Sequence, residues 1–162
     1  MNKDDVGAMM TVRFGKHTGK SVGLLVLKEP DYVAWLLTKC DLCRSALAAS
    51  EEAVRLIGIF DAKPLLTNCS GRDCAATATR GTAYNSTTWS LMWWCDACDP
   101  YQGGAHGGKL HSIRTYQDAI DHVRIHCIAR RDALCTLIRA IAVAKGLPGR
   151  VGEAQANAFF TA

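Results

Sequence analysis

The pattern with the clearest chemistry is a set of four cysteines in the middle of the chain. Cys69 and Cys74 are separated by four residues, Cys95 and Cys98 by two, and twenty residues lie between the two pairs. Zn²⁺ binds four thiolates tetrahedrally, and two short loops that each present two sulfurs can meet at one such point. The spacing therefore predicts one structural zinc ion. Because four thiolates leave no open coordination position, we expect no catalysis at this ion.

The segment around these cysteines resembles a four-cysteine zinc ribbon. Between the two pairs, β-forming residues over 77–84 and 89–94 predict two strands, with a turn at Asn85 and Ser86. These strands can return as an antiparallel hairpin that brings the two cysteine pairs together. We therefore expect a central zinc ribbon over residues 63–112.

A second short cysteine pair leaves an alternative open. Cys40 and Cys43 could replace the first pair and join Cys95 and Cys98 at the metal. However, they continue the helical register of the preceding residues, and a spacing of three puts both on one helix face. Cysteine is an ordinary small core residue in such a position. We favour core packing for this pair and for the two cysteines further along the chain, Cys127 and Cys135.

The histidines offer a weaker metal-binding pattern. His122 and His126 stand four apart on a predicted helix, a geometry that can bind metal. The glutamate that follows the first histidine in H-E-x-x-H is absent, and no nearby carboxylate pattern indicates a catalytic centre. We therefore favour packed or solvent-facing histidines. His106 and His111 flank a glycine-rich loop and could replace a cysteine of the cluster, although four cysteines suffice.

A glycine-rich turn near the N-terminus is similar to a nucleotide-binding loop but is one residue short. In the run from Gly15 to Ser21, the first glycine of a true P-loop would fall at position 14, which is Phe14. Residues 21–27 read as a strand, so the amides of a helix N-terminus are not expected beside the turn. ATP or GTP hydrolysis is therefore not predicted.

The same turn carries a family resemblance. Residues 14–21, with the following Pro30-Asp31-Tyr32-Val33-Ala34-Trp35-Leu36-Leu37, resemble the small C-terminal module of exodeoxyribonuclease X-like proteins. The resemblance covers less than a quarter of the chain, and the acidic catalytic domain of the nuclease has no counterpart in it. It implies association with DNA-processing proteins and gives no catalytic activity.

Cations gather at the turn and around the predicted ribbon. Lysine and arginine contacts to phosphates position a nucleic-acid backbone without reading its sequence. The net charge of +4 permits such binding without requiring it. The predicted contact residues are Arg13, Lys16, His17, Lys20, Arg72, Arg80, Lys109 and Arg114.

The surrounding patterns predict an α+β protein with a small N-terminal β-hairpin and helices, the central zinc ribbon and a C-terminal helical segment. The hairpin would pair residues 9–14 with 21–27, and helices would begin at Pro30 and Ser50. Residues 115–145 read as helix with a break near Arg130. The predicted organisation is a hairpin-helix module (1–62), the ribbon (63–112), a helix or helix pair (113–148) and a tail without pattern (149–162).

The apolar runs are far shorter than the ~20 residues of a membrane span. The acidic start lacks the apolar core of a secretion signal, so we expect a cytoplasmic protein in which clustered cysteines hold metal. The function we expect is a zinc-stabilised nucleic-acid-binding accessory protein, for DNA foremost, without its own catalysis, in a phage, mobile-element or defence system. The alternative is a protein-interaction subunit of a larger nucleic-acid-guided or ribonucleoprotein complex.

Overall fold

The computed structural model describes residues 9–38, 44–84, 91–99, 110–128 and 130–162. Over these residues the protein has six α-helices and one three-stranded antiparallel sheet, which confirms the predicted α+β class. The chain forms two compact units. The helical unit comprises residues 1–62 and 147–162, and the sheet unit comprises residues 63–146. None of the described helices is long and apolar enough to cross a membrane.

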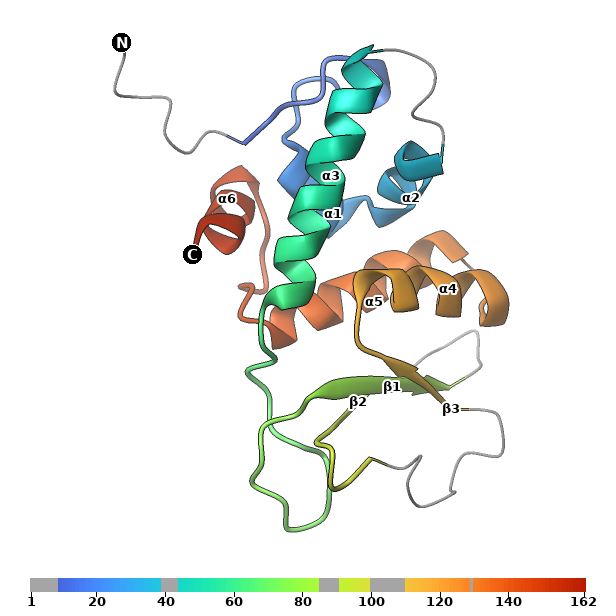
Figure 1. Cartoon of the computed structure of the whole chain (residues 1–162), viewed down its shortest axis with the longest axis vertical. Coiled ribbons are helices and arrows are strands. Elements are labelled where there is room, and N and C mark those ends of the chain that lie inside the picture. The colour runs from blue at the N-terminus through green and yellow to red at the C-terminus, as the bar shows by residue number, and fades with distance from the viewer. Residues whose placement is uncertain (1–8, 39–43, 85–90, 100–109, 129) are drawn as a thin grey trace. The chain divides into compact units, whose positions relative to one another are not determined.

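Four helices build the helical unit: α1 (Val22–Lys28), α2 (Pro30–Thr38), α3 (Arg44–Ala62) and α6 (Glu153–Thr161). Helix α1 packs against the other three, and α3 also packs against α2 and α6 (Figure 1). The core consists of side chains that are almost fully buried, among them Leu25, Val26, Val33, Leu56 and Phe60.

The predicted N-terminal β-hairpin is wrong. Only one antiparallel bridge, between Thr11 and Ser21, joins its two halves in the described residues, and residues 22–28 are helical. Ser21 begins α1 as its N-cap, because its hydroxyl accepts a hydrogen bond from the N–H of Leu24 at 3.1 Å. A short run that is apolar throughout has the same pattern in a buried strand and a buried helix, so periodicity could not distinguish them.

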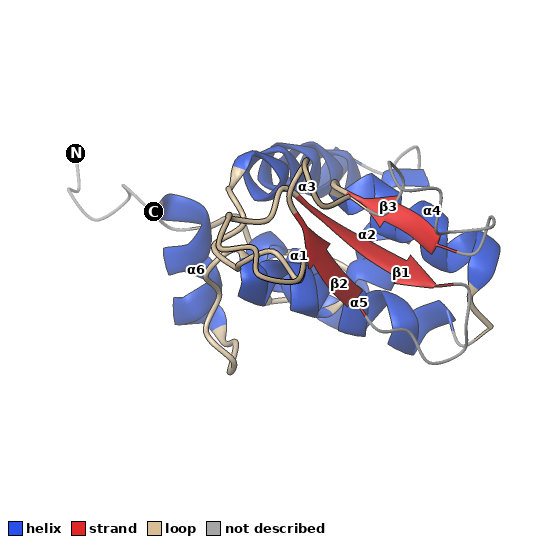
Figure 2. Cartoon of the chain, turned by 90° about the horizontal axis from the view of Figure 1, so that it is seen from below, coloured by secondary structure: helices blue, strands red, loops and turns tan. Residues whose placement is uncertain are grey.

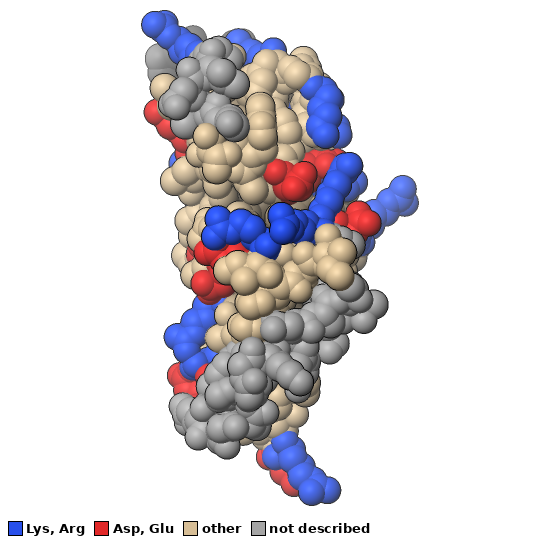
Figure 3. Space-filling model, turned by 90° about the vertical axis from the view of Figure 1, so that its right-hand side faces the viewer, with Lys and Arg blue, Asp and Glu red and all other residues tan. Residues whose placement is uncertain are grey.

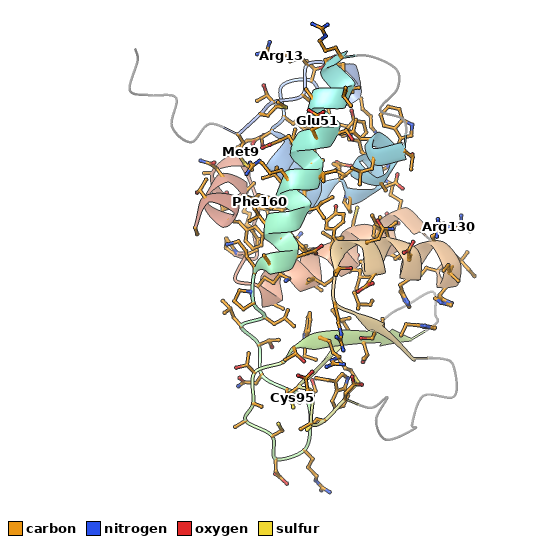
Figure 4. All side chains as sticks on the ribbon, viewed as in Figure 1. Met9, Arg13, Glu51, Cys95, Arg130 and Phe160 are labelled. Carbon is orange, nitrogen blue, oxygen red and sulfur yellow. The ribbon has the colours of Figure 1, made fainter. Side chains whose placement is uncertain are left out.

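The predicted patternless tail is also wrong, because residues 153–161 form α6. Its apolar side chains Ala156, Phe159 and Phe160 are buried and lie on one helix face. Phe160 reaches α1 at Gly23, where an added Cβ would lie 3.2 Å from the Phe160 ring and would overlap the Met9 side chain. Figure 4 labels Met9 and Phe160 on the side of the unit where α6 packs.

The sheet unit contains β1 (Arg80–Tyr84), β2 (Leu91–Trp94) and β3 (Leu110–Ile113) in the order β2-β1-β3 (Figure 2). The predicted hairpin is confirmed, since Arg80 pairs with Trp94 and Ala83 with Leu91 in antiparallel register. The third strand was not predicted. It is only four residues long, and it pairs with the opposite edge of β1 through Gly81 and Ile113.

Two helices lie against one side of this sheet, α4 (Tyr116–His126) and α5 (Arg130–Ala144) (Figures 1 and 2). The predicted break near Arg130 is confirmed, because α4 ends at His126 and α5 begins at Arg130. Thr115 and Asp118 form the capping box that begins α4. The Asp118 N–H donates to Thr115 Oγ1 at 3.1 Å, and the Thr115 N–H donates to Asp118 Oδ2 at 2.9 Å.

Candidate metal centre

Cys69, Cys74, Cys95 and Cys98 come together in the sheet unit, with all four sulfurs within 4.8 Å of one another. The Sγ atoms of Cys74 and Cys95 are 3.8 Å apart, and none of the four forms a disulfide. Figure 4 labels Cys95 among the loops on the side of the sheet away from α4 and α5. The four cysteines therefore lie close enough to coordinate one metal ion.

The first loop is closed by backbone hydrogen bonds. An antiparallel bridge joins Asn68 to Thr77, and the Cys69 N–H donates to the carbonyl of Ala76 at 2.8 Å. Inside this closure the Cys74 N–H donates to the carbonyl of Gly71 at 3.2 Å. These bonds turn the chain so that both cysteines of the loop face the same point.

Two backbone features let this loop approach the cluster. Asp73 has a φ of +56°, in the left-handed region that aspartate tolerates better than most residues. An added Cβ at Gly71 would lie 2.7 Å from the Sγ of Cys98, so only glycine leaves room for that sulfur.

The second loop continues directly from β2. The N–H of Cys98 donates to the carbonyl of Cys95 at 3.2 Å, which closes a tight turn between the two cysteines. The Ser70 N–H donates to the carbonyl of Trp93 at 2.7 Å and joins the first loop to β2. The N–H groups of Gly71 and Cys95 each lie 3.3 Å from the Sγ of Cys69. Amides directed at sulfur stabilise a thiolate ligand.

The acid–base behaviour of the cluster favours a cation. The backbone N–H of Cys98 lowers the pKa of Cys95 to about 7. Its neighbours, Cys74 first, raise the pKa of Cys98 to about 12. One thiolate is thus stabilised, while hydrogen bonds to the neighbouring sulfurs, then burial and the charge of Cys69, oppose ionisation of Cys98. A divalent ion removes that opposition, because it compensates the added negative charge.

An ion-paired arginine fixes the second loop to the sheet. Arg80 on β1 donates to the carboxylates of Asp96, within the Cys95–Cys98 turn, and Asp99, directly after it. The side chains of Arg80 and Asp99 are only 11% and 3% exposed. Arg80 was predicted to contact nucleic acid, but here its charge is compensated inside the unit, and it holds the Cys95–Cys98 loop against the sheet instead.

The other predicted contact residues fall into three groups. Arg13, Lys16 and Lys20 are exposed at the glycine turn, and Arg72 and Arg114 are exposed on the sheet unit. His17 is 4% exposed and packs edge-on against Tyr32, with ring centroids 4.5 Å apart, which removes it from the contact surface. Lys109 lies outside the described residues.

The glycine turn differs from a P-loop in its contacts as well as its length. Gly15, Lys16 and His17 form one turn of 3-10 helix, and α1 follows directly, contrary to the strand predicted there. The helix N-terminus is nevertheless occupied. The N–H and the hydroxyl of Ser21 both donate to the carboxylate of Glu153 on α6. A carboxylate in this position repels a phosphate, so the amides are not available to a nucleotide.

The remaining cysteines do not add to the described cluster. Cys127 is 6% exposed, and burial raises the pKa of its thiol. Cys135 is half-buried on α5. Cys40 and Cys43, the alternative pair, lie outside the described residues, so their participation stays a prediction.

The structure assembles a second group of metal-binding side chains that the sequence did not lead us to favour. His111, His122 and His126 lie within metal-binding distance of one another in the sheet unit. The spacing of His122 and His126 was visible in the sequence. The third histidine could not be placed with them because β3, which carries it, was not predicted.

Comparison with known proteins found no matching family model, no matching curated protein and no matching solved structure.

Proposed function

We propose that this chain is a zinc-stabilised nucleic-acid-binding protein in which the two units have separate tasks. The four-cysteine cluster binds one zinc ion that stabilises the sheet unit. The exposed face of the glycine turn in the helical unit contacts the nucleic acid, with DNA as the expected partner. This face, called here the turn surface, consists of Arg13, Lys16, Lys20 and Trp35.

Zinc fits the cluster by its ligand chemistry. Four cysteine sulfurs that all lie within 4.8 Å of one another suit the tetrahedral thiolate coordination that zinc prefers. Mg²⁺ and Ca²⁺ prefer oxygen ligands over thiolates. Four protein ligands also leave no position for a substrate. The cluster therefore supports a structural role, and the function depends on what the folded protein displays.

The observation that carries the nucleic-acid proposal is the construction of the turn surface. The chain exposes three cations, Arg13, Lys16 and Lys20, while His17 between them is buried beneath. The Nζ of Lys20 lies 3.4 Å from the Nδ1 of His17, which ties one of the cations to the edge of the packed ring. A buried anchor of this kind holds a turn in one conformation and keeps its charges pointing outward.

An exposed aromatic ring completes the surface. Tyr32 packs on His17 and stacks on Trp35, with the latter two ring centroids 5.4 Å apart. Trp35 is 44% exposed, unusual for so large an apolar side chain. Cations beside an exposed aromatic ring are typical of surfaces that hold phosphates and stack unpaired bases. Single-stranded nucleic acid is therefore the preferred form.

The distribution of charge elsewhere is mixed. Figure 3 shows acidic side chains beside basic ones on the face that it draws. On α3 and α4, for example, Arg55 pairs with Glu52 at 2.7 Å and Arg124 with Asp121 at 3.1 Å. Paired charges add little to phosphate binding, so the turn surface is the better candidate.

The test is fluorescence anisotropy with labelled single-stranded DNA, duplex DNA and single-stranded RNA across a salt series. Lys16→Ala/Lys20→Ala should weaken binding and reduce the slope of log Kd against log salt by about 1.4 for single strands, at ~0.7 per phosphate contact. Trp35→Ala should weaken single-strand binding by ~1–3 kcal/mol and leave duplex binding nearly unchanged.

The matched control is Lys28→Ala/Arg150→Ala, which removes two exposed cations of the same unit outside the turn surface. It should change the slope far less than the turn variant. Equal effects of the two double variants would show that only net charge matters. Affinity that no variant alters would remove the turn surface from the function.

A second candidate, a protein-interaction subunit, is favoured by one observation on the sheet unit. Ile125 at the end of α4 is 65% exposed, and Ile128 just beyond it is 83% exposed. Adjacent exposed isoleucines are more typical of an interface than of a solvated surface. Ile125→Ser/Ile128→Ser should abolish a stable, stoichiometric co-purifying partner while leaving nucleic-acid affinity unchanged. If no partner co-purifies with the unaltered protein, this candidate fails.

A further inference from the structure

Three histidines meet at the contact between β3 and α4 in the sheet unit. His111 comes from the strand, and His122 and His126 come from successive turns of the helix. One ring nitrogen of each lies within 4.8 Å of the others. The rings of His111 and His126 stack with centroids 3.9 Å apart, and the His122 ring lies 5.3 Å from that of His126.

Regular secondary structure sets this geometry. Residues four apart share one face of a helix, so His122 and His126 project to the same side of α4. Only Arg114 and Thr115 separate β3 from α4, and the capping box of Thr115 fixes where the helix begins. Strand and helix are therefore held side by side, and His111 faces the helical pair.

The buried nitrogens of this cluster lack the partners that such atoms usually have. His122 is 5% exposed, and neither of its ring nitrogens has a hydrogen-bond partner among the described residues. The Nε2 of His111 is also buried without a hydrogen-bond partner among the described residues. Burying a polar group without a partner is energetically costly, so native proteins rarely retain three together. A bound ion would supply the missing interaction.

Two of the three histidines have lowered pKa values, which is consistent with their burial. Burial lowers the pKa of His122 to about 4, and burial and the nearby His126 lower the pKa of His111. Neutral imidazole is the ligand form, and a proton competes with a metal for the same lone pair.

Nearby carboxylates do not provide another explanation for the cluster. Asp118 and Asp121 line the same surface hollow of about 200 Å³ as the three histidines. Asp118 is engaged by the N–H groups of Arg114 and Thr115 in the helix cap. Asp121 accepts from Gln117 and pairs with Arg124. Each carboxylate already has partners, so the histidines are not arranged as its cationic counterparts.

We propose that His111, His122 and His126 form a second metal site, which takes a divalent first-row transition metal, zinc foremost. Three imidazoles suit zinc, nickel and copper, and hard ions such as Mg²⁺ prefer oxygen ligands. Unlike the four-cysteine cluster, three protein ligands leave a coordination position for water or a small anion. This site is independent of the nucleic-acid proposal, and either can fail alone.

Cobalt substitution distinguishes the two sites within one protein. Protein holding one zinc at the cysteines is titrated with Co²⁺, and the absorption spectrum is recorded. Cobalt bound to imidazoles gives visible d–d bands, whereas cobalt bound to thiolates adds intense charge-transfer bands in the near ultraviolet. We expect one further equivalent with d–d bands alone. Azide should then shift these bands, because one position is open.

The test variant is His126→Ala, because His126 is half-buried and its truncation disturbs the core less than that of His122. It should lower cobalt affinity at least tenfold, and His111→Ala/His126→Ala should abolish the second equivalent. The zinc retained by the cysteines serves as an internal measure of folding. His17→Gln, in the other unit, is the matched control and should leave the titration unchanged.

Three results would overturn the proposal. These are the absence of a second equivalent in folded wild-type protein, a second equivalent that survives the double histidine substitution, and charge-transfer bands showing that cobalt has entered the cysteine cluster. A second equivalent that azide does not affect would overturn the open coordination position.

Discussion

The sheet unit holds two clusters of metal-binding side chains that are built in opposite ways. The cysteines lie on loops closed by a few backbone hydrogen bonds. The histidines lie on a strand and a helix whose packing does not depend on a metal. We expect such loops to need an ion to keep four crowded sulfurs together. A capped helix packed against a sheet can hold three histidines with or without a bound ion. We therefore expect metal to be part of folding at the first cluster and an addition to a finished structure at the second.

The largest expected effect comes from breaking the cysteine cluster. Cys74→Ser, or removal of the metal by a strong chelator, should abolish cooperative thermal unfolding of the sheet unit, because binding free energy there is folding free energy. Thiol titration should show four more reactive cysteines in metal-free than in metal-bound protein. His126→Ala should cause neither change. If both variants destabilise the unit equally, the contrast between the clusters is wrong.

The next effect concerns the charge buried under the cysteine loops. Arg80→Ala leaves the almost fully buried Asp99 without its cation, and breaking one side of such a pair costs about 3–5 kcal/mol. Because Arg80 also holds the Cys95–Cys98 turn, metal affinity at the cysteines should fall by about 10–100-fold. Denaturant unfolding and competition with a chromogenic chelator measure the two effects. Arg72→Ala, an exposed arginine of the same unit, should change stability by less than ~0.5 kcal/mol.

A smaller substitution tests the crowding of the sulfurs. Gly71→Ala places a methyl group 2.7 Å from the Sγ of Cys98, and overpacking of this kind costs about 1–3 kcal/mol. The loss should appear as weaker zinc binding at the cysteines, with cobalt binding at the histidines unchanged. Gly58→Ala, at a glycine with open space around it, is the control and should have no such effect.

The smallest expected effect falls on the histidine side. Thr115→Ala removes the N-cap of α4 and should cost about 1 kcal/mol. A frayed first turn loosens the helix that presents His122 and His126, so cobalt affinity there should fall while zinc at the cysteines is retained. An unchanged cobalt titration would show that the cap has no part in positioning the histidines.

The cysteine cluster could be predicted because its signal is local. Each loop places two ligands a few residues apart, and the hairpin between the loops also has a local pattern of β-forming residues. The capping box that begins α4 depends on a local pattern as well, because Thr115 and Asp118 are three residues apart. Arg80 shows the limit of this reasoning, because its burial depends on Asp96 and Asp99 folding back over β1.

The errors arose where the structure depends on contacts distant in the sequence. Residues 22–28 are helical because Ser21 caps them and α3 and α6 bury them. The packing partners α3 and α6 cannot be read from the sequence of this short segment. The histidine site needs β3, whose pairing with β1 spans an interval of more than twenty residues. The helical spacing of Ala156, Phe159 and Phe160 could have predicted α6, but the composition of this segment obscured the pattern.

The order of the chain has a consequence for synthesis on the ribosome. The sheet unit is inserted into the helical unit, and its two ends are joined, since the Leu66 N–H donates to the Ala144 carbonyl at 2.7 Å and the Lys145 Nζ to the Lys63 carbonyl at 2.5 Å. The inserted part can fold as soon as it has emerged and metal is bound at its cysteines. The first helices must wait for the last residues, because Glu153 receives both hydrogen bonds from Ser21 only after α6 has left the exit tunnel. A nascent chain stalled just before α6 would therefore carry a folded sheet unit beside a helical unit that has not yet completed its folding.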